Sequence, residues 1–536
     1  MNSFIANLQA RTENGAVSYF STGKELVDQF GKAASYRGRH YSIVADDQKR
    51  LWDENPAAAI KFPFYLRLIT REVKVSENTR TEKVQRGAGA RDEAFKRLLW
   101  LAYNHYEAFA NNIWLLPVIG SWKDLWTLLV LDAELERKLD KSFIFSIIAT
   151  GLSDDVQSNL IRKYMPAIKS AAKCKTDRAR ALNTLAKNFA NYLGLSAKSY
   201  RKMKTEGTAH DFQKLICARK FNEIDFNTIP GKALLNLVSG KFLNNHALYN
   251  KYIEWIKAQP VAKFNGYPYE LGAKLNIYGR RTTDLATKIT IDKQFENLIA
   301  TGKKDNGAIT GNVWCALDTS GSMCCTLPGT NVTAMNICLS LGIYFSTLNE
   351  GAFHKNVIMF DSTSYVKQLK GSFTEMWDQV PSDAMGSTNF QSIVDEIVRI
   401  RTTRPNVPLE DYPQTILVVS DMQFNPSGTY QYNYHPSRIE EMTNIEAAKA
   451  KLKKVFPEEF VDKMKFVWWN VDSRATNDFP STLEDGGSYF FSGFDGAIIS
   501  FLLGGNAKAK EDGTPLSAED IVNEALNQEI FSFIKS

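Results

Sequence analysis

The spacing of apolar residues changes once along the chain, close to residue 305, and this change constrains the fold more than any other feature. From about residue 90 to 280, apolar residues recur every three or four positions, which places them on one face of a helix. After residue 305, short apolar runs alternate with amphipathic segments. A chain of 536 residues is also longer than one compact core usually holds. We therefore predict two domains, a helical one over 1–304 and an α/β one over 305–536.

The helical half contains two segments with clear boundaries. Residues 92–114 step their apolar side chains by three or four, which predicts one long helix. Residues 178–194 repeat this pattern and stop at Gly194, a residue type that commonly ends helices, and Ser196 can cap the next helix. Short connections between such helices favour antiparallel pairs that stack into a solenoid.

The second half alternates short apolar runs with helical segments. The runs occupy residues 313–317, 356–360, 415–420, 465–471 and 488–491. This alternation predicts a doubly wound, Rossmann-like sheet that is mostly parallel and has helices on both faces. The predicted class of the whole chain is therefore α + α/β.

Five oxygen-bearing side chains follow the predicted strands or lie in a loop before a helix: Asp318, Ser320, Ser322, Thr388 and Asp421. Because the carboxyl ends of strands in a doubly wound sheet converge on one crevice, we expect these side chains to meet. Hydroxyls and carboxylates without His or Cys are hard ligands, which suit Mg²⁺ or Mn²⁺ and not zinc. We predict a metal site there, with water or a partner's carboxylate completing the shell.

The order of these residues, D-x-S-x-S with a later Thr and Asp, resembles the metal-ion-dependent adhesion site of von Willebrand factor A (vWA) domains. Ser and Asp also make ordinary turns and caps after strands, so a lone D-x-S-x-S would be a weak signal. The alternative is a vWA fold whose site has lost its metal.

An aspartyl-phosphate phosphatase is the enzymatic alternative for a strand that ends in Asp. Such an enzyme carries a second Asp two residues further on as general acid, and here that position is Ser320. The six histidines are scattered, and the sequence holds no G-x-S-x-G or Walker loop. We expect that the protein is not an enzyme.

The net charge of +6 averages two unlike halves of the chain. Residues 1–300 hold 46 Lys and Arg against 30 Asp and Glu, whereas residues 301–536 hold 19 against 29. The excess is strongest over residues 151–300, with 25 against 12. A basic half of this kind favours a polyanionic partner, although a solvated basic surface gives the same counts.

The spacing of the cysteines and the length of the apolar runs indicate the cellular compartment of the protein. The six cysteines show no C-x-x-C spacing, which argues against a disulfide framework and favours a reducing compartment. The first residues lack a signal-peptide pattern, and no run reaches the roughly 18 apolar residues of a membrane span. We expect a cytoplasmic protein without membrane contact.

Several phrases, spread in order along the chain, resemble the Ro autoantigen or TROVE-domain family, and most closely a divergent TROVE-like branch with a vWA domain that occurs in viral and cellular genomes. Among them are TENGAVSYFSTG at 12–23, LGLSAKSYRK at 193–202, LDTSGSM at 317–323 and VVSDMQFN at 418–425. The resemblance implies a ring of HEAT-like repeats closed by the vWA domain. It also implies that single-stranded RNA ends enter the ring and that structured small RNA binds the outer basic surface.

The region between 161 and 220 supplies matching chemistry. Basic side chains there can neutralise phosphates, and an exposed Tyr164 or Tyr200 can stack on bases. The family likeness is strongest at LGLSAKSYRK, so the transfer of RNA contacts is firmest over Arg201 to Lys204. The candidate RNA-binding residues are Lys163, Lys169, Lys173, Lys175, Arg178, Arg180, Tyr200, Arg201, Lys202, Lys204, Arg219 and Lys220.

These features lead to two hypotheses. The first is a non-catalytic ribonucleoprotein component that holds small or misfolded RNA in a helical ring and docks a protein partner through a Mg²⁺-dependent vWA site. The second is a metal-dependent assembly scaffold, including a component of a viral or nucleoprotein particle, without RNA specificity.

Overall fold

The computed structural model of the protein describes residues 9–69, 72–73, 82–84, 86–137, 139–155, 157–206, 211–239, 243, 246–275, 283–380, 386–427, 442–472, 479–496 and 516–535. The chain forms two compact units, each built from separate stretches of sequence. The α/β unit comprises Met1–Arg39 and Pro230–Ala525, and the helical unit comprises His40–Ile229 and Leu526–Ser536. The predicted class, α + α/β, is confirmed, but the chain does not divide between 304 and 305 as predicted.

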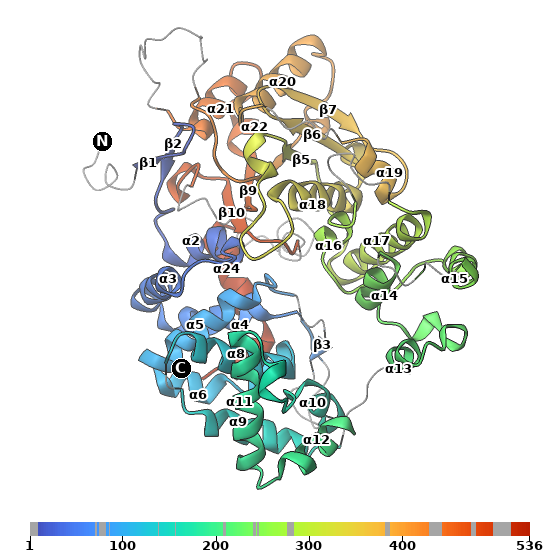
Figure 1. Ribbon diagram of the computed structural model, residues 1–536. Helices are drawn as coiled ribbons and strands as arrows, with labels where there is room; N and C mark the ends of the chain where they lie inside the picture. Colours follow the sequence, from blue (N-terminus) through green and yellow to red (C-terminus); the bar gives the residue numbers. More distant parts are fainter. Residues whose placement is uncertain are drawn as a thin grey trace. The chain divides into compact units, whose positions relative to one another are not determined.

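The α/β unit is organised around a six-stranded sheet (Figure 1). All neighbouring strands are parallel except the pair β6 and β7 at one edge. The strand order is β10-β9-β8-β5-β6-β7. The strands are β5 (Val313–Asp318), β6 (Asn356–Phe360), β7 (Ser364–Gln368), β8 (Thr415–Ser420), β9 (Lys465–Asn470) and β10 (Ser488–Ser492).

The apolar runs form strands because the sheet is buried on both faces. Every residue of β5, β8 and β10 is buried, which explains why these strands read as continuous apolar runs and not as alternating ones. The antiparallel strand β7 was not predicted from the sequence. Its residues are half-buried or exposed, so it carries no continuous apolar run.

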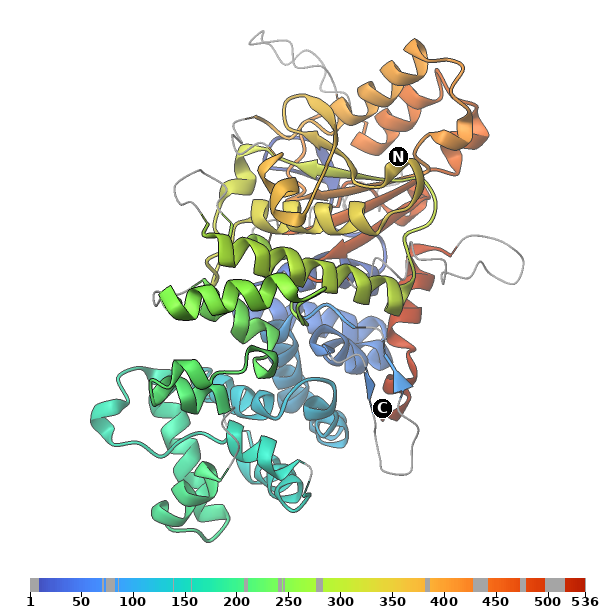
Figure 2. The ribbon, with the colours of Figure 1, turned by 90° about the vertical axis from the view of Figure 1, so that its right-hand side faces the viewer.

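Helices cover both faces of the sheet. In Figure 2, α17 and α18 lie on one side of the strands, and α20 and α21 lie on the other. Helix α18 is buried along its whole length, as expected for a helix that packs on β5, β6 and β8. The helices that follow β5 are α18 (Ala334–Leu348), α19 (Phe373–Asp378), α20 (Gln391–Thr403), α21 (Asn444–Leu452), α22 (Glu458–Asp462) and α24 (Ala518–Leu526), with 3-10 turns η6 (Gly321–Cys324), η7 (Gly351–Phe353), η8 (Leu409–Asp411) and η9 (Leu483–Asp485).

Within the described residues, four helices between 230 and 306 also belong to the α/β unit. Phe295 of α17 packs its ring against Phe373 of α19, with ring centroids 4.5 Å apart. Asp292 accepts hydrogen bonds from the backbone and side chain of Thr374 at 2.8 and 2.9 Å. Because these helices pack on the α/β unit, the boundary between the two units lies at residue 230 and not at 305. The four helices are α14 (Gly231–Val238), α15 (His246–Ala258), α16 (Pro268–Gly272) and α17 (Leu285–Asn306).

The first described residues join the same unit. Strands β1 (Gln9–Arg11) and β2 (Val17–Tyr19) form a hairpin, and Tyr19 continues into an antiparallel bridge with Phe479. Helix α2 (Glu25–Lys32) and the 3-10 turn η1 (Ala33–Ser35) pack on β10. Packing across more than 400 residues of sequence therefore places the start of the chain in the α/β unit.

The helical unit consists of short helices in which successive helices pack on one another. Helix α11 ends before Gly194, whose φ of +66° is the left-handed conformation that favours glycine, and Ser196 caps α12 as predicted. The predicted long helix over 92–114 is divided at His105, where the backbone leaves the helical region and the ring stacks on Trp52 at 3.6 Å.

The elements of the helical unit are α3 (Tyr41–Glu54), α4 (Pro56–Arg67), β3 (Glu72–Val73), β4 (Glu82–Lys83), α5 (Arg91–Asn104), α6 (Tyr106–Asn112), α7 (Leu115–Ile119), α8 (Trp122–Glu134), α9 (Lys141–Leu152), α10 (Ser158–Tyr164), η2 (Ala171–Lys173), α11 (Asp177–Tyr192), α12 (Ala197–Thr205), α13 (Asp211–Cys217), η3 (Phe221–Glu223), η4 (Phe226–Thr228) and η10 (Glu529–Phe533).

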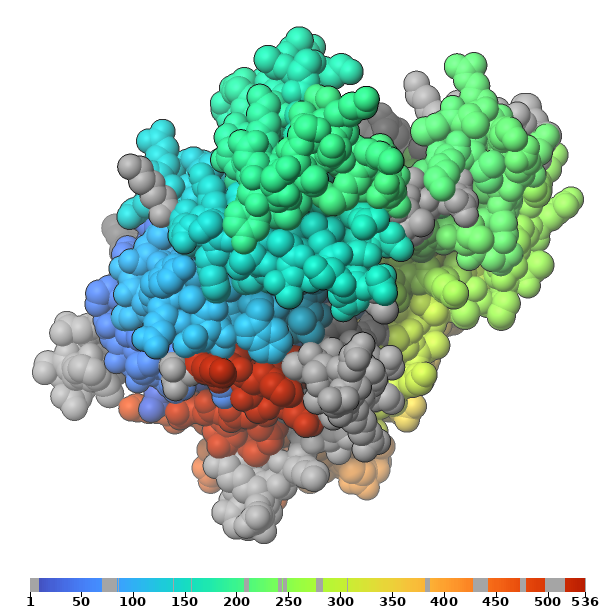
Figure 3. Space-filling view, turned by 90° about the horizontal axis from the view of Figure 1, so that it is seen from below, coloured from blue at the N-terminus to red at the C-terminus, as the bar shows by residue number. Residues whose placement is uncertain are grey.

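The end of the chain returns to the helical unit. Asn112 donates to the Lys535 carbonyl at 2.7 Å and accepts from the Lys535 amide at 2.8 Å. Figure 3 shows this segment in red against the blue helices of the same unit. Among the described residues of the whole chain, no helix is long and apolar enough to cross a membrane.

Candidate functional site

The two carboxylates of the predicted metal site lie at the ends of neighbouring strands. Asp318 is the last residue of β5, and Asp421 directly follows β8. The two strands are parallel, with Leu317 opposite Val419, so both chains reach the same edge of the sheet. Asp318 and Asp421 are 0% and 1% exposed. The sheet therefore holds two carboxylates, at positions 103 residues apart in sequence, together at one buried edge.

The loop after β5 turns back over Asp318. The Ser320 amide donates to Asp318 Oδ1 at 2.9 Å, a short-range turn that fixes the carboxylate. The hydroxyls of Ser320 and Ser322 lie 3.2 Å apart. Ser320 is buried and Ser322 is half-buried, so Ser322 is the more exposed of the two. The D-x-S-x-S segment thus brings three of the predicted ligands together.

Thr388 is joined to the loops that carry both carboxylates. The Gly321 amide donates to the Gly386 carbonyl at 3.1 Å, and the Asn425 amide donates to the Thr388 carbonyl at 2.8 Å. The Asn425 side chain also donates to the Ser387 hydroxyl at 2.8 Å. Thr388 is 1% exposed. All five predicted ligands therefore lie in one network of loops at the carboxyl edge of the sheet.

At this edge of the sheet, the two acidic side chains Asp318 and Asp421 are buried near each other and shielded from water. Burial raises the pKa of Asp318, and the nearby charge of Asp421 raises it further. Burial and the charge of Asp318 also raise the pKa of the Cys338 thiol well above its usual value. A cation at this edge would offset the repulsion between the two carboxylates.

The donor set fits a hard divalent cation. Carboxylate and hydroxyl oxygens are ligands that Mg²⁺ and Mn²⁺ accept, and neither His nor Cys is among the five. Within the described residues, no group of three or more His, Cys, Asp or Glu side chains is arranged to hold a metal. All six cysteines lack a disulfide partner, in agreement with the sequence. The candidate ligands are Asp318, Ser320, Ser322, Thr388 and Asp421.

Sequence reasoning missed a residue that holds this site. Ser420 Oγ donates to Asp318 Oδ2 at 2.5 Å and accepts from the Met422 amide at 3.0 Å. It is 0% exposed at the end of β8. A polar residue that ends an otherwise apolar strand, beside a predicted ligand, is the signal that could have identified it.

The basic candidates belong to the helical unit and gather around α10, η2, α11 and α12. Their segments are joined by hydrogen bonds: the Lys169 amide donates to Asn183 Oδ1 at 2.8 Å, and Arg201 Nε donates to the Ile168 carbonyl at 3.2 Å. Lys204 Nζ donates to the Lys163 carbonyl at 3.1 Å. The loop between α10 and α11 is thus fixed against α12. The turquoise to green surface in Figure 3 includes α9 to α12.

Tyr200 is not a base-stacking residue, in contrast to its prediction as an RNA contact. Its side chain is 0% exposed, its hydroxyl donates to the Pro166 carbonyl at 2.9 Å, and its ring packs edge-on against Phe189. Tyr200 lies on the buried face of α12, where it anchors the loop after α10. Tyr164 is half-buried beside Lys163.

The basic candidates differ in exposure and in partners. Arg178 lies 3.9 Å from Glu134, Arg180 pairs with Asp177, and Lys220 lies 3.1 Å from Glu223. Lys204 is half-buried, and burial lowers its pKa. Within the described part of the chain, six exposed candidates form no ion pair: Lys169, Lys173, Lys175, Arg201, Lys202 and Arg219. Arg219 and Lys220 are exposed but follow α13, outside the hydrogen-bonded group of α10 to α12.

Comparisons with known proteins give two family models and a similar structure. Residues 313–531, which include all five candidate ligands, match a domain of unknown function, DUF7788. Residues 12–214, which include most of the basic candidates, match a second domain of unknown function, DUF2828. No curated protein matches. The chain is similar to the crystal structure of the Deinococcus radiodurans RO (RSR) protein, with 14% identity, a TM-score of 0.45, and coverage of 90% of this chain and 98% of that chain.

Proposed function

We propose that the protein binds RNA through the basic surface of its helical unit, formed by Lys169, Lys173, Lys175 and Lys202 together with Arg201. The observation that carries this proposal is the charge balance of residues 157–206. They contain twelve Lys and Arg and two acidic residues, Asp177 and Glu206. Both acids are already paired with arginines, Asp177 with Arg180 and Glu206 with Arg162. The remaining positive charge has no local counter-charge within this segment.

A phosphate backbone is the ligand chemistry that this surface matches. Exposed ammonium groups neutralise phosphates and release counterions, which gives affinity that falls steeply with salt. The segment that presents them is fixed by hydrogen bonds to α11 and α12, so the charges are held in place before RNA arrives. The TROVE resemblance of LGLSAKSYRK, in α12 and the turn before it, supports RNA over another polyanion.

For the α/β unit we propose a vWA-type site that binds Mg²⁺ or Mn²⁺ through Asp318, Ser320, Ser322, Thr388 and Asp421. A bound Mg²⁺ would supply positive charge between the carboxylates and a coordination position for a carboxylate of a protein partner. The chain's own residues orient the two carboxylates, through the Ser320 amide and the Ser420 hydroxyl. The buried pair of Asp318 and Asp421 supports this part of the proposal.

The remaining elements of the proposal follow the resemblance. The RNA has a structured body and a single-stranded 3′ end, held in the ring of HEAT-like repeats that the TROVE family implies. The protein acts without catalysis, in the cytoplasm, and its partner reaches it through the metal site.

A second candidate function is a metal-dependent assembly scaffold without RNA specificity. Two observations favour it: the metal-site residues are assembled within the α/β unit alone, and the burial of Tyr200 removes a predicted stacking platform. In this case, Asp318→Ala abolishes partner capture, and the basic surface contacts an acidic protein.

Co-purification with and without ribonuclease separates the two candidates. RNA binding predicts absorbance at 260 nm that travels with the protein and disappears after ribonuclease treatment. Sequencing of the co-purified nucleic acid then identifies the RNA. A protein that purifies free of RNA, yet retains a partner protein in a Mg²⁺-dependent and Asp318-dependent manner, supports the scaffold and contradicts the first proposal.

A further inference from the structure

The turn between β1 and β2 has a fixed local geometry. The Gly15 amide donates to the Thr12 carbonyl at 2.9 Å, and the amide of Ala16 donates to Thr12 Oγ1 at 3.0 Å. Gly15 has a φ of +91°, which L side chains rarely adopt. The sequence Asn14-Gly15 is a strong signal for a tight hairpin turn. The turn therefore presents Thr12, Glu13 and Asn14 in one defined arrangement.

This turn contacts the loop that directly follows Asp421. Thr12 Oγ1 donates to the Phe424 carbonyl at 2.6 Å, and Asn14 Nδ2 donates to the Gln423 carbonyl at 2.5 Å. The Glu13 amide donates to Gln423 Oε1 at 2.6 Å. Three successive residues of the turn thus bind two successive residues of the loop, across about 410 positions of sequence.

The loop adopts a conformation that needs such support. Met422 has a φ of +65°, an uncommon value for a residue with a side chain. Such conformations persist where the surrounding structure holds them, often beside functional sites. The Gln423 amide, in turn, donates to Asp421 Oδ1 at 3.2 Å. The position of Gln423 therefore affects the orientation of the Asp421 carboxylate.

The hairpin and the residues after it are themselves anchored to the segment that precedes β10. The amide and carbonyl of Tyr19 exchange hydrogen bonds with Phe479, each at 2.9 Å, and the Leu483 amide donates to the Thr22 carbonyl at 3.1 Å. Thr12 is 6% exposed, so its hydroxyl contact with the loop is shielded from water. The turn is thus a rigid support and not a segment resting on the surface.

We propose that the turn Thr12–Gly15 is a clamp that holds the loop Met422–Asn425 in the conformation that aims Asp421 at the metal, with Thr12 and Asn14 as positioning residues. This inference rests on the metal site proposed above. It assigns a role to the TENG sequence near the start of the chain, which lies far in sequence from every candidate ligand.

Amide hydrogen exchange tests the clamp in the metal-free protein. Thr12→Val and Asn14→Ala each remove one hydrogen bond to the loop, so exchange across 418–427 should become about fivefold faster in each variant. Thr12→Ser keeps the hydroxyl and should match the wild type. Thr205→Val removes an exposed hydroxyl that donates to the Lys202 carbonyl in the helical unit, and it should leave exchange over 418–427 unchanged.

Mn²⁺ affinity, measured by titration calorimetry on the same full-length proteins, tests the link to the metal. Loss of a residue that orients a ligand typically weakens metal binding about tenfold or more, so both clamp variants should bind Mn²⁺ at least about tenfold more weakly. Thr12→Ser and Thr205→Val should retain wild-type affinity. Thermal unfolding of each variant without metal shows that the chain still folds.

The outcomes separate the clamp from the metal site itself. Unchanged exchange and unchanged Mn²⁺ affinity in folded Thr12→Val and Asn14→Ala would overturn the clamp. Faster loop exchange with unchanged Mn²⁺ affinity would show that the turn holds the loop but does not position Asp421, and would also overturn the proposal. A wild-type protein that binds no Mn²⁺, while the clamp variants still exchange faster, would overturn the metal site and leave the contact of the turn with the loop supported.

Discussion

Ser420 Oγ donates a 2.5 Å hydrogen bond to Asp318 Oδ2, and both side chains are 0% exposed. The same hydroxyl accepts from the Met422 amide at 3.0 Å. One serine therefore joins the first strand of the candidate metal site to the loop after the neighbouring strand. Its hydroxyl is hydrogen-bonded both to Asp318 and to the loop that carries Asp421, and it holds the Asp318 carboxylate in one orientation.

Ser420→Ala should destabilise the protein and weaken metal binding. The substitution leaves a buried carboxylate oxygen and a buried amide without their partner, which costs about 2 kcal/mol. Chemical denaturation in EDTA measures this loss. The matched control is Ser346→Ala in α18, because Ser346 is also 0% exposed but donates only to the Ile343 carbonyl of its own helix. Equal losses in the two variants would contradict a special role for Ser420.

Asp421→Asn should separate stability from metal binding. The amide oxygen can still accept from the Gln423 amide, while one of two buried like charges disappears. In EDTA we expect the free energy of unfolding to stay equal or to rise by about 1 kcal/mol. Wild type should gain about 3 kcal/mol when Mg²⁺ is present at a hundred times its dissociation constant, and the variant should gain nothing.

The matched control for this substitution is Asp395→Asn. Asp395 is an exposed residue of α20 that pairs with Lys451 at 2.6 Å, and it is not one of the candidate ligands. It should keep the full stabilisation by Mg²⁺. If Mg²⁺ stabilises neither the wild type nor this control, the α/β unit does not hold the metal.

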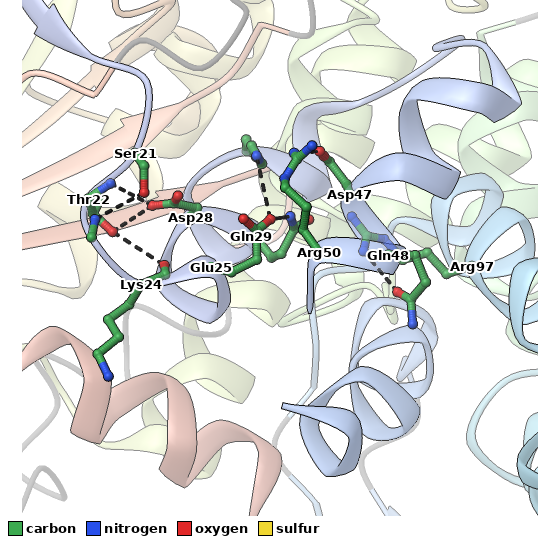
Figure 4. Close-up of polar contacts among 12 residues, drawn as sticks. Ser21, Thr22, Lys24, Glu25, Asp28, Gln29, Asp47, Gln48, Arg50 and Arg97 are labelled. Carbon is green, nitrogen blue, oxygen red and sulfur yellow. Dashed lines mark hydrogen bonds and ion pairs between the residues drawn. The ribbon is translucent and has the colours of Figure 1, made fainter. Parts of the chain in front are cut away.

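Asp28 of the α/β unit should make stability depend on pH. Thr22 donates to Asp28 Oδ1 from its amide and its hydroxyl at 2.7 and 2.6 Å, and Ser21 lies beside them (Figure 4). Burial nevertheless raises the pKa of Asp28 to about 6. Because the folded state holds this proton more tightly than the unfolded state does, Asp28 stabilises the fold fully below about pH 4. That contribution is lost as the pH rises to about 6.

Asp28→Asn should remove this dependence. The shift of the pKa from 3.8 to about 6 sets an upper limit of about 3 kcal/mol on the cost of the charged form. Denaturation at pH 4 and pH 7 should show that the substitution stabilises the protein more at pH 7 than at pH 4. An identical pH profile for wild type and variant would show that Asp28 does not titrate in this range.

Much of the α/β unit could be predicted from the sequence because its signals are local. Strands buried on both faces need continuous apolar runs, and the runs at 356–360 and 415–420 coincide with β6 and β8. The rule that parallel strands expose their carboxyl ends at one edge then brought Asp318 and Asp421 together. The position of the predicted strands along the chain was therefore sufficient to predict that these two residues lie at the same edge.

Other features of the structure are not indicated by the pattern of the neighbouring sequence. The hairpin at 9–19 joins the α/β unit through contacts with residues beyond 420, which no nearby pattern indicates. Tyr200 lies in a basic segment, and charge alone could not show that its ring faces Phe189 and its hydroxyl faces Pro166. The boundary at 230 depends on packing of α17 against α19, since α17 has the same helical spacing as the helices of the other unit.

The basic surface should account for the salt dependence of RNA binding. Replacing Lys169, Lys173, Lys175 and Lys202 by Gln removes four exposed charges that form no ion pair within the described residues. If each contacts one phosphate, the slope of log affinity against log salt should fall by about 3. The control changes four exposed lysines of the α/β unit to Gln: Lys370, Lys453, Lys454 and Lys463.

The most direct test of the central claim is filter binding of a structured RNA with a single-stranded 3′ end, followed across a series of salt concentrations. We predict that the wild-type protein retains the RNA at low salt and that its affinity falls steeply as the salt concentration rises. The variant that lacks Lys169, Lys173, Lys175 and Lys202 should show a shallower slope of log affinity against log salt, and the control variant should match the wild type. Absence of RNA retention by the wild-type protein at low salt would contradict the account.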